Sequence, residues 1–498
     1  MLQLHVDNNF MARSCSASKA ISAVRIPVVL FLLLMSLECP QAHGGSVAVV
    51  LNESLNESMD RITGSGHTAV YFSNICADSP VRLRLCHPGE LGSVMSTYIN
   101  IGEDQSYEWN IVPLSVYLYG VEDPRNRPIF GSYKIKRALE ERYRERYLSE
   151  YCRSSACRTS PKAEWREMVA ATLVRGVYLF VVDSTVEQDQ QLIAEFNDSA
   201  NRNHFNGITR NCADFTRHII NTYFPHAVRP DYINDFGMTS PKAVARTFTR
   251  YAHRHPESNF RVLHFPQVPG TIKRSSEVRS GTEQLYRSKK LLFPMILFAD
   301  HELPFVAASY LLTARFSPER EFEKHPATEL GVKYSDVLAE PAAVSATSEP
   351  AELVGTSKEW KRYRKSLAFA LKDRKDVVSR RDLAHFFNDL DQAGTVSVDS
   401  DGSAWIEISK NGEPLAVGVS ASNNLVPGSN PQLAYTLLLA RTSRILKSPN
   451  HRRETLLEFR QDWANLQQAS KDLETLSAGD AAALKTGRSM IVPGGGED

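Results

Sequence analysis

The sequence predicts an α+β fold in which an antiparallel sheet packs on helices. Two observations lead to this prediction. Short segments rich in β-forming residues, separated by turn residues, fill residues 66–120, which is typical of neighbouring antiparallel strands. Beyond residue 130 the apolar residues mostly recur at helical spacing, interrupted by one apolar run at 176–182 that reads as a buried strand. The 498 residues suffice for two or three domains.

The first β-rich stretch predicts a hairpin. Residues 67–73 are rich in β-formers, and residues 81–85 alternate strictly between apolar and charged side chains. Asp78-Ser79-Pro80 between them supplies turn residues. Cys76 and Cys86 bracket the turn, so a disulfide between them is geometrically reasonable. Further strands are expected at residues 95–101 and 107–119.

Helix starts are marked by capping residues. Residues 133–151 predict a charged helix, and Ser184-Thr185 followed by Glu187-Gln188 has the pattern of a capping box. Asn211 before Cys212 predicts a third start, in a helix with one apolar face that Pro225 ends. Ser240-Pro241 predicts a fourth, because serine caps well and proline fits the first helical position.

The N-terminal 44 residues have the parts of a secretory signal. Basic residues at 13, 19 and 25 precede an apolar run at 26–37, which is shorter than the roughly twenty residues a membrane helix needs. Ala42-His43-Gly44 offers small residues for cleavage near Gly44, and an uncleaved anchor is the alternative. Residues 45–60 read as a polar lead-in. No later transmembrane span is expected, because the apolar stretch 291–312 is interrupted by charges at its centre.

Composition divides the remaining chain. We expect a main domain at 60–260, a helical extension at 261–330, a linker rich in Ala, Glu, Pro, Ser and Thr at 331–357, a small α+β unit at 358–470 and a disordered tail at 487–498. Within the small unit, Asp401-Gly402 predicts the turn of a hairpin. The 58 basic residues balance the 57 acidic ones, so no net field favours nucleic acid.

Cysteine spacing singles out Cys212. Of the seven cysteines, two lie in the signal segment, and four form close pairs, Cys76 with Cys86 and Cys152 with Cys157. That leaves one thiol, at the expected first turn of a helix. The unpaired N–H groups and the dipole of a helix start favour the thiolate, which is the nucleophilic form, and the same N–H groups could hold an oxyanion. A thiol nucleophile needs a base within reach, and His67 is the best candidate.

These two sites carry a resemblance. Gly66-His67-Thr68 opening a strand, and Asn211-Cys212-Ala213 opening a helix far downstream, resemble an uncharacterised bacterial family with one histidine and an Asn-Cys-Thr motif. That family is similar to the permuted papain-like proteins, which include NlpC-type cell-wall peptidases and lecithin–retinol acyltransferase relatives. The resemblance covers residues 60–250, and Ala213 departs from the family's threonine. It implies a permuted papain-like domain with Cys212 as nucleophile and His67 as base.

The resemblance also implies a third, base-orienting residue on a neighbouring strand. Asn100 is preferred as the third catalytic residue, with His87 as the alternative. No cofactor and no metal are expected. Cys76, Cys86 and His87 lack the two tight ligand pairs typical of zinc sites.

Three histidines further along the chain, His253, His255 and His264, are scattered over a helix end and a loop. We interpret them as surface residues.

The resulting hypothesis is an exported cysteine hydrolase or acyltransferase of the bacterial envelope, periplasmic or secreted. It would act on an amide or ester bond through an acyl-enzyme, with peptidoglycan peptides as the first candidate substrate and lipid acyl groups as the second. The alternative is a non-catalytic envelope module that uses the same fold to bind or scaffold.

Overall fold

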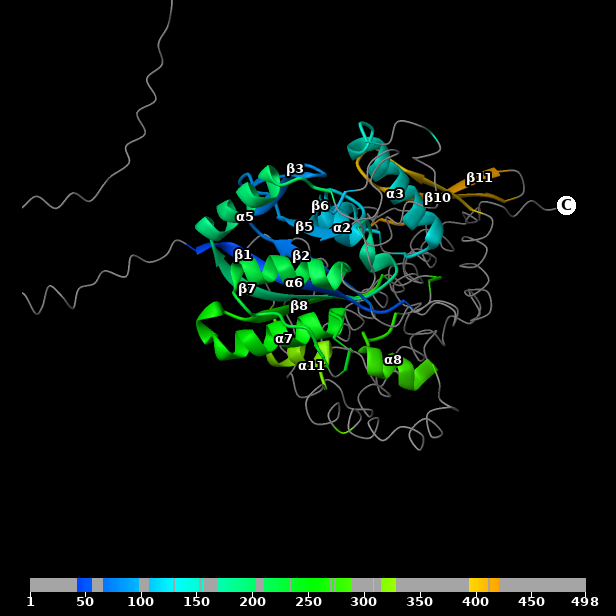
Figure 1. The fold of residues 1–498 in the computed structure, drawn as a ribbon. Coiled ribbons are helices and arrows are strands. Elements are labelled where there is room, and N and C mark those ends of the chain that lie inside the picture. The colour runs from blue at the N-terminus through cyan, green and yellow to red at the C-terminus, as the bar shows by residue number, and fades with distance from the viewer. Residues whose placement is uncertain are drawn as a thin grey trace, which may run out of the picture. The chain divides into compact units, whose positions relative to one another are not determined.

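The computed structural model describes residues 43–55, 66–97, 107–128, 130–151, 155, 168–202, 210–232, 234–235, 237–268, 271–272, 275–288, 308, 315–327, 394–410 and 413–420. Residues 1–42 form a unit of their own and lie outside this part of the chain, as do Asn100, Cys152, Cys157, the linker and the tail. The described residues form an α+β fold of antiparallel sheets and helices (Figure 1).

The main sheet has six strands in the order β6-β5-β2-β1-β7-β8, and every neighbouring pair is antiparallel. Its strands are β1 (His43–Asn52), β2 (His67–Phe72), β5 (Ser93–Thr97), β6 (Trp109–Pro113), β7 (Val177–Thr185) and β8 (Arg261–Phe265). The strands from β2 to β6 form from short β-rich segments joined by close turns. The order places β1, from the N-terminal end of the described chain, at the centre of the sheet.

The position of β1 differs from the sequence-based expectation. We expected residues 45–60 to be a polar lead-in, yet β1 pairs along its length with β2 on one side and β7 on the other. Its residues 47–51 are all essentially inaccessible to solvent. A strand that is buried on both faces is apolar at every position and does not alternate, so residues 47–51 lack the alternation that marks a half-buried strand. β1 also includes His43 and Gly44, the last two residues of the expected signal segment.

Helices cover both faces of this sheet. One face carries α2 (Leu114–Tyr119) and α3 (Tyr133–Tyr147), and the other carries α5 (Val186–Asp198), α6 (Cys212–Tyr223) and α7 (Pro241–Arg254). Strand residues alternate between the two cores: Ala69 and Tyr71 of β2 join the α2 side, whereas Val70 and Phe72 join the α6 side. This alternation decides which side chains can meet which helix.

The predicted hairpins are present. β3 (Ile75–Ser79) and β4 (Arg82–Leu85) pair as a two-stranded sheet, and a disulfide joins Cys76 to Cys86 as expected. β9 (Thr395–Val398) and β10 (Ala404–Lys410) pair across the predicted turn, and β11 (Glu413–Gly418) adds a third strand. Ala404 and Ile406 of β10 are buried in the same core as α3, so this hairpin packs on the main body.

Residues 261–330 contain more than the expected helical extension. β8 is a strand of the main sheet, and two short helices follow, α8 (Gly281–Ser288) and α11 (Pro318–Lys324). His264 on β8 was expected at the surface, but it is 2% exposed and stacks on Tyr178 of the neighbouring strand. Within the described ranges, no helix combines the length and apolar character needed to cross a bilayer.

Candidate active site

Cys212 is the first residue of α6, as the sequence predicted. Asn211 has an extended backbone and caps the helix: its side-chain oxygen accepts hydrogen bonds from the N–H groups of Ala213 at 2.8 Å and Asp214 at 3.0 Å. The Asn211 N–H donates in return to the Asp214 carboxylate at 3.4 Å, which completes a capping box. Cys212 is partly exposed and is not a half-cystine.

The thiol lies on the sheet-facing side of α6. Residues one turn and two turns further along, Thr216 and Ile219, are fully buried, and they share the face of the helix on which Cys212 begins. Ile219 belongs to the core between α6 and the sheet. The Cys212 side chain therefore starts on the side of α6 that meets the strands.

α6 runs along β2 in the same direction (Figure 1). Phe72, the last residue of β2, packs against Tyr223, the last residue of α6, with ring centroids 5.9 Å apart. The 6 residues of β2 and the 12 residues of α6 each span about 17 Å, at about 3.3 Å per strand residue and 1.5 Å per helical residue. Because their C-terminal ends coincide and their lengths match, His67 and Cys212, the first residues, lie at the same end of the sheet.

The two side chains nevertheless start from opposite faces. His67 is opposite Asn52 on β1, and its Nε2 lies 3.0 Å from the hydroxyl oxygen of Ser96 on β5. These residues share the α2 side of the sheet by strand alternation, whereas α6 covers the other side. His67 is the first residue of β2, and Gly66 before it has a φ of +71°.

The residue that would orient the imidazole was expected to be Asn100, with His87 as the alternative. Asn100 lies outside the described residues. His87 is exposed and follows Cys86, whose N–H donates to the carbonyl of Asn74, so His87 belongs to the far end of β2 from His67. Ser96, on the strand next to β2, is fully buried and contacts the imidazole directly. A serine on a short strand has no distinguishing pattern, so only the register of β2 with β5 reveals this contact.

Asn52 is the second residue that the sequence did not identify. It is fully buried, its side-chain amide donates to the Tyr117 hydroxyl at 2.6 Å, and its side-chain oxygen accepts no hydrogen bond from the described residues. That buried oxygen belongs to the cross-strand partner of His67. Asn52 was overlooked because it lies in the segment that was expected to be a lead-in.

The capping box changes the expected oxyanion site. Two N–H groups of the first turn, those of Ala213 and Asp214, are already bonded to the Asn211 side chain. Neither of these two bonds involves the main-chain N–H of Cys212. A carbonyl attacked by the Cys212 sulfur would lie close to that group.

The segment between α6 and α7 is tied to this helix start. The Thr239 hydroxyl donates to the Asp214 carboxylate at 2.6 Å, and Arg217 reaches both groups, at 2.8 Å to the Thr239 hydroxyl and 3.2 Å to the carboxylate. The Asn211 amide also donates to the Thr239 carbonyl at 3.3 Å. Thr239 therefore forms a wall beside the start of α6.

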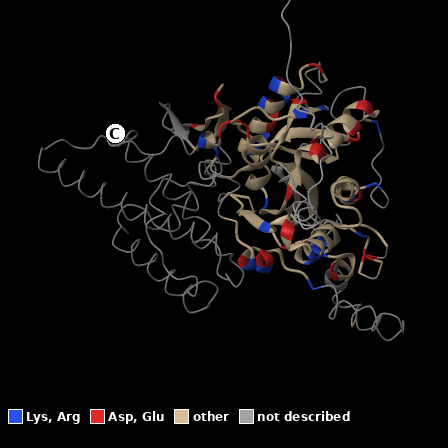
Figure 2. Ribbon diagram, turned by 90° about the vertical axis from the view of Figure 1, so that its left-hand side faces the viewer, with Lys and Arg blue, Asp and Glu red and all other residues tan. Residues whose placement is uncertain are grey.

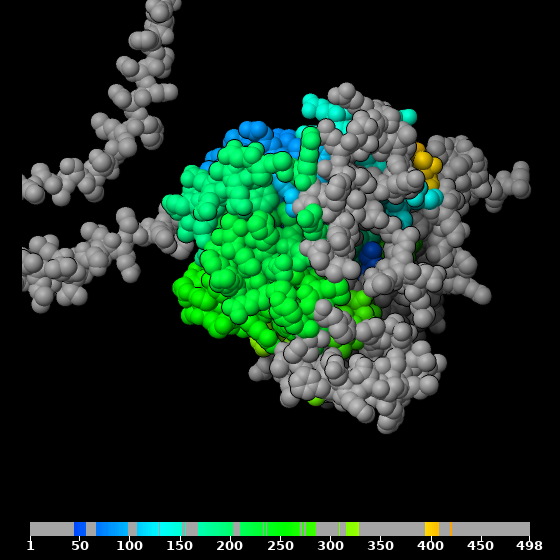
Figure 3. All heavy atoms as spheres, viewed as in Figure 1, coloured from blue at the N-terminus to red at the C-terminus, as the bar shows by residue number. Residues whose placement is uncertain are grey.

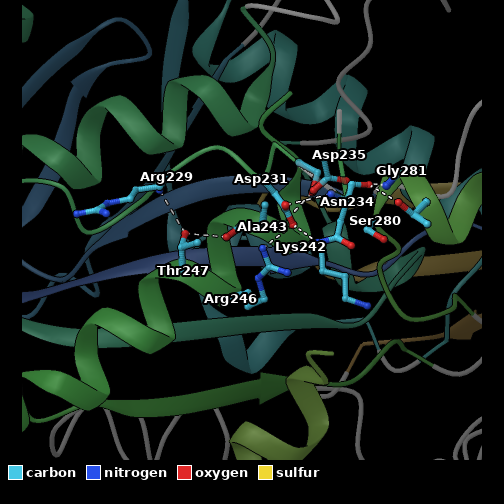
Figure 4. A network of polar contacts seen from close by, with 12 residues as sticks. Arg229, Asp231, Asn234, Asp235, Lys242, Ala243, Arg246, Thr247, Ser280 and Gly281 are labelled. Carbon is cyan, nitrogen blue, oxygen red and sulfur yellow. Dashed lines mark hydrogen bonds and ion pairs between the residues drawn. The ribbon is translucent and has the colours of Figure 1, made fainter. Parts of the chain in front are cut away.

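A buried polar network holds that wall (Figure 4). Asp231 accepts hydrogen bonds from Asn234 and from Arg246 of α7, and Asp235 accepts from Ser240 at 2.7 Å and from the N–H of Gly281 at 2.6 Å. Burial favours the neutral form of Asp231, but the bonds from Asn234 and Arg246 outweigh it and lower the pKa of this carboxyl. Burial raises the pKa of Asp235, which has no cationic partner of its own among these bonds.

Charged residues of both signs lie among the described elements. Acidic and basic residues are interspersed on the helices and turns around a largely uncharged sheet (Figure 2). α5, α6 and α7 form one continuous face in the space-filling view, in green (Figure 3).

The chain matches no protein-family model, no curated protein and no solved structure. The residues at the shared end of β2 and α6 are therefore the basis for a proposal of function.

Proposed function

We propose that this protein is an exported cysteine hydrolase or acyltransferase of the permuted papain-like type. Cys212 would be the nucleophile and His67 the base, and the substrate would carry an amide or ester bond, with cell-wall peptides the first candidate and lipid acyl groups the second. The observation that carries the proposal is the packing of Phe72 on Tyr223. From this packing we infer that Cys212 and His67 lie at the same end of the sheet.

The proton path follows from the histidine's contacts. Ser96 engages Nε2 of His67, so Nδ1, the ring nitrogen nearer the main chain, would take the thiol proton. Because the ring and the thiol start on opposite faces, this transfer needs one bridging water or a small rotation of the ring about the end of β2. Both are compatible with general-base catalysis, since catalytic hydrogen bonds often tighten only when substrate binds.

The reaction then has two stages. The Cys212 thiolate attacks the carbonyl carbon, the carbonyl oxygen takes the negative charge beside the Cys212 N–H, and the C–N or C–O bond breaks as the His67 imidazolium protonates the leaving group. Water, or an acceptor amine or alcohol, loses a proton to His67 and attacks the thioester. This attack releases the product and returns the thiol.

The disulfide supports an oxidising compartment. Cys76–Cys86 fits secreted or periplasmic proteins, in which such bonds persist. It is therefore consistent with export by the signal-like segment at residues 1–44.

The test combines thiol chemistry with turnover. The rate of Cys212 alkylation by iodoacetamide should be measured across pH in protein whose Cys76–Cys86 disulfide is intact. The thiolate of Cys212 should persist to a pH below the range in which ordinary thiols ionise. His67→Ala should abolish this low-pH reactivity. Hydrolysis of acyl-ester and peptidoglycan-peptide probes should be lost in Cys212→Ala and reduced about 10²- to 10⁴-fold in His67→Ala, the usual range for a general base. Exposed His218→Ala is the matched histidine control. Unchanged turnover in both variants would refute the proposal.

One observation favours a second candidate, a non-catalytic binding or scaffolding module of the envelope. His67 is 8% exposed and bonded to Ser96 on the face away from α6, which is also how a structural histidine satisfies its ring nitrogen. In that case the alkylation rate of Cys212 would follow an ordinary thiol and would be insensitive to His67→Ala.

A further inference from the structure

Two histidines and a glutamate meet where the end of α7 faces α11 (Figure 1). They are His253 in the last turn of α7, Glu321 within α11 and His325, the residue that caps α11. One ligand atom from each lies within 4.8 Å of the others. No other group of three His, Cys, Asp or Glu side chains in the described ranges is as close, apart from the disulfide-bonded Cys76 and Cys86 with Glu90.

The contacts between these side chains fit a set of metal ligands better than an ion pair. His253 Nε2 lies 3.3 Å from the Glu321 carboxylate oxygen Oε2, but that oxygen is buried and accepts no well-aligned hydrogen bond from the described residues. The two imidazole rings are 5.0 Å apart between centroids, and Phe260 packs on both. Two imidazoles placed together cannot satisfy each other when both are protonated.

From this arrangement we infer that His253, Glu321 and His325 bind a divalent transition-metal ion, with zinc as the best fit. Imidazole nitrogen and carboxylate oxygen are the zinc ligands of many protein sites. In a tetrahedral site with bonds of about 2.0–2.1 Å, ligand atoms are about 3.3 Å apart, which is the separation of His253 Nε2 and Glu321 Oε2.

Neighbouring charges define what each ligand contributes. The C-terminal ends of α7 and α11 both point to the site, and the negative end of a helix dipole favours a cation. Lys324 pairs with the other oxygen of Glu321 at 3.2 Å, and Arg254 follows His253, so nearby positive charge opposes the ion. The Glu321 carboxylate is therefore needed for charge compensation, and the imidazoles for selectivity. The side chain of His253 is 38% exposed, which leaves room for water as a fourth ligand.

The metal would fasten one segment to the main body. The His325 carbonyl accepts from the N–H of Val262 on β8 at 2.8 Å, and Ala327 donates to the Val262 carbonyl at 2.9 Å. Residues 325–327 thus already lie along the edge strand, and Phe322 of α11 is buried in the core beneath α7. An ion bridging His253 to Glu321 and His325 would lock α11 against the end of α7.

The test is zinc binding by the full chain, carried out in a Cys212→Ser background after removal of metal by chelation. Calorimetric titration with Zn²⁺ should give one site, and His253→Ala, His325→Ala and Glu321→Gln should each weaken it by about 100-fold or more, at least the loss seen when outer-shell partners are removed. Zinc should also raise the melting temperature of the parent and slow hydrogen exchange in residues 315–327, and none of the three variants should show these effects.

A matched control uses His218 of α6 and Glu195 of α5, a pair of one histidine and one glutamate. His218 lies 3.8 Å from Glu195 on an exposed surface without a second imidazole, so His218→Ala should leave zinc affinity unchanged. Circular dichroism establishes that each variant is folded. Absence of zinc binding by the folded parent, or parent-like binding by the folded His253→Ala/His325→Ala double variant, would overturn the inference.

Discussion

Nε2 of His67 lies 3.0 Å from the hydroxyl oxygen of Ser96, across the junction of two neighbouring strands of the main sheet. This contact orients the imidazole and determines which ring nitrogen is directed away from Ser96. It also links the proposed base to β5, the strand next to β2.

Ser96→Ala tests this orientation. Loss of one neutral hydrogen bond, worth about 1 kcal/mol, should reduce kcat for the ester probe about fivefold and leave KM nearly unchanged, because Ser96 does not contact the substrate. The pH dependence of kcat should shift with it, since the tautomer of His67 is no longer selected. Ser96→Thr, which keeps the hydroxyl, should retain most of the activity. An equal loss in KM and kcat would argue for a packing effect instead.

Asn211→Ala tests the cap beside the nucleophile. The N–H groups of Ala213 and Asp214 would lose their acceptor, so the free energy of unfolding should fall by about 1 kcal/mol, the usual cost of removing such a cap. Asn211→Asp should keep most of that stability, because aspartate caps equally well. Urea unfolding of the three proteins provides the comparison, and identical midpoints for Asn211→Ala and the parent would contradict the capping role.

Arg246→Met tests the buried pair behind the wall of the site. Arg246 and Asp231 are both below a tenth exposed, and removing one partner of a buried ion pair typically costs about 3–5 kcal/mol. Asp231→Asn/Arg246→Met removes both charges and should recover part of the loss. Urea unfolding should therefore rank the single variant below the double variant. Cys212 alkylation should also change in Arg246→Met, because Ser240 of the same network follows Thr239, which bonds to Asp214 at the start of α6.

Acid titration tests the pair at the far hairpin. Two hydrogen bonds from Arg84, each 2.7 Å long, are the main cause that lowers the pKa of Glu90 from 4.5 to about 2. A carboxyl with a lowered folded-state pKa stabilises the fold above its unfolded-state pKa and loses that contribution as pH falls. Stability should therefore decline between about pH 4.5 and pH 2 through this group, and Glu90→Gln should flatten that part of the curve. Glu257→Gln, for which no such partner occurs, serves as the control.

Local signals predicted local structure well. The cap at Asn211, the capping box of Thr185 with Gln188, the Ser240-Pro241 helix start and the Cys76–Cys86 hairpin are all present, because each depends on residues close in sequence. The pairing of Cys152 with Cys157 stays a prediction.

Long-range pairing was harder to predict. The strands β1 and β8 were not predicted from the sequence. β1 pairs with β2 and β7, and β8 pairs with β7. No short turn connects β1 or β8 to β7, so no local signal indicates these pairings. His264 was taken as a surface residue because the stacking partner that buries it, Tyr178, belongs to that unseen pairing. The contact between His67 and Ser96 required the register between β2 and β5, which the sequence does not specify.

The place of β1 has a consequence for how the chain folds. Val47 must pair with Phe72 on one side and with Val182 on the other, so the sheet closes only after synthesis has passed residue 182. Contacts of such separation slow folding, and β2 and β7 expose unpaired edges until β1 enters between them. Folding should therefore be late and cooperative, and neither half of the sheet should hold a functional thiol by itself.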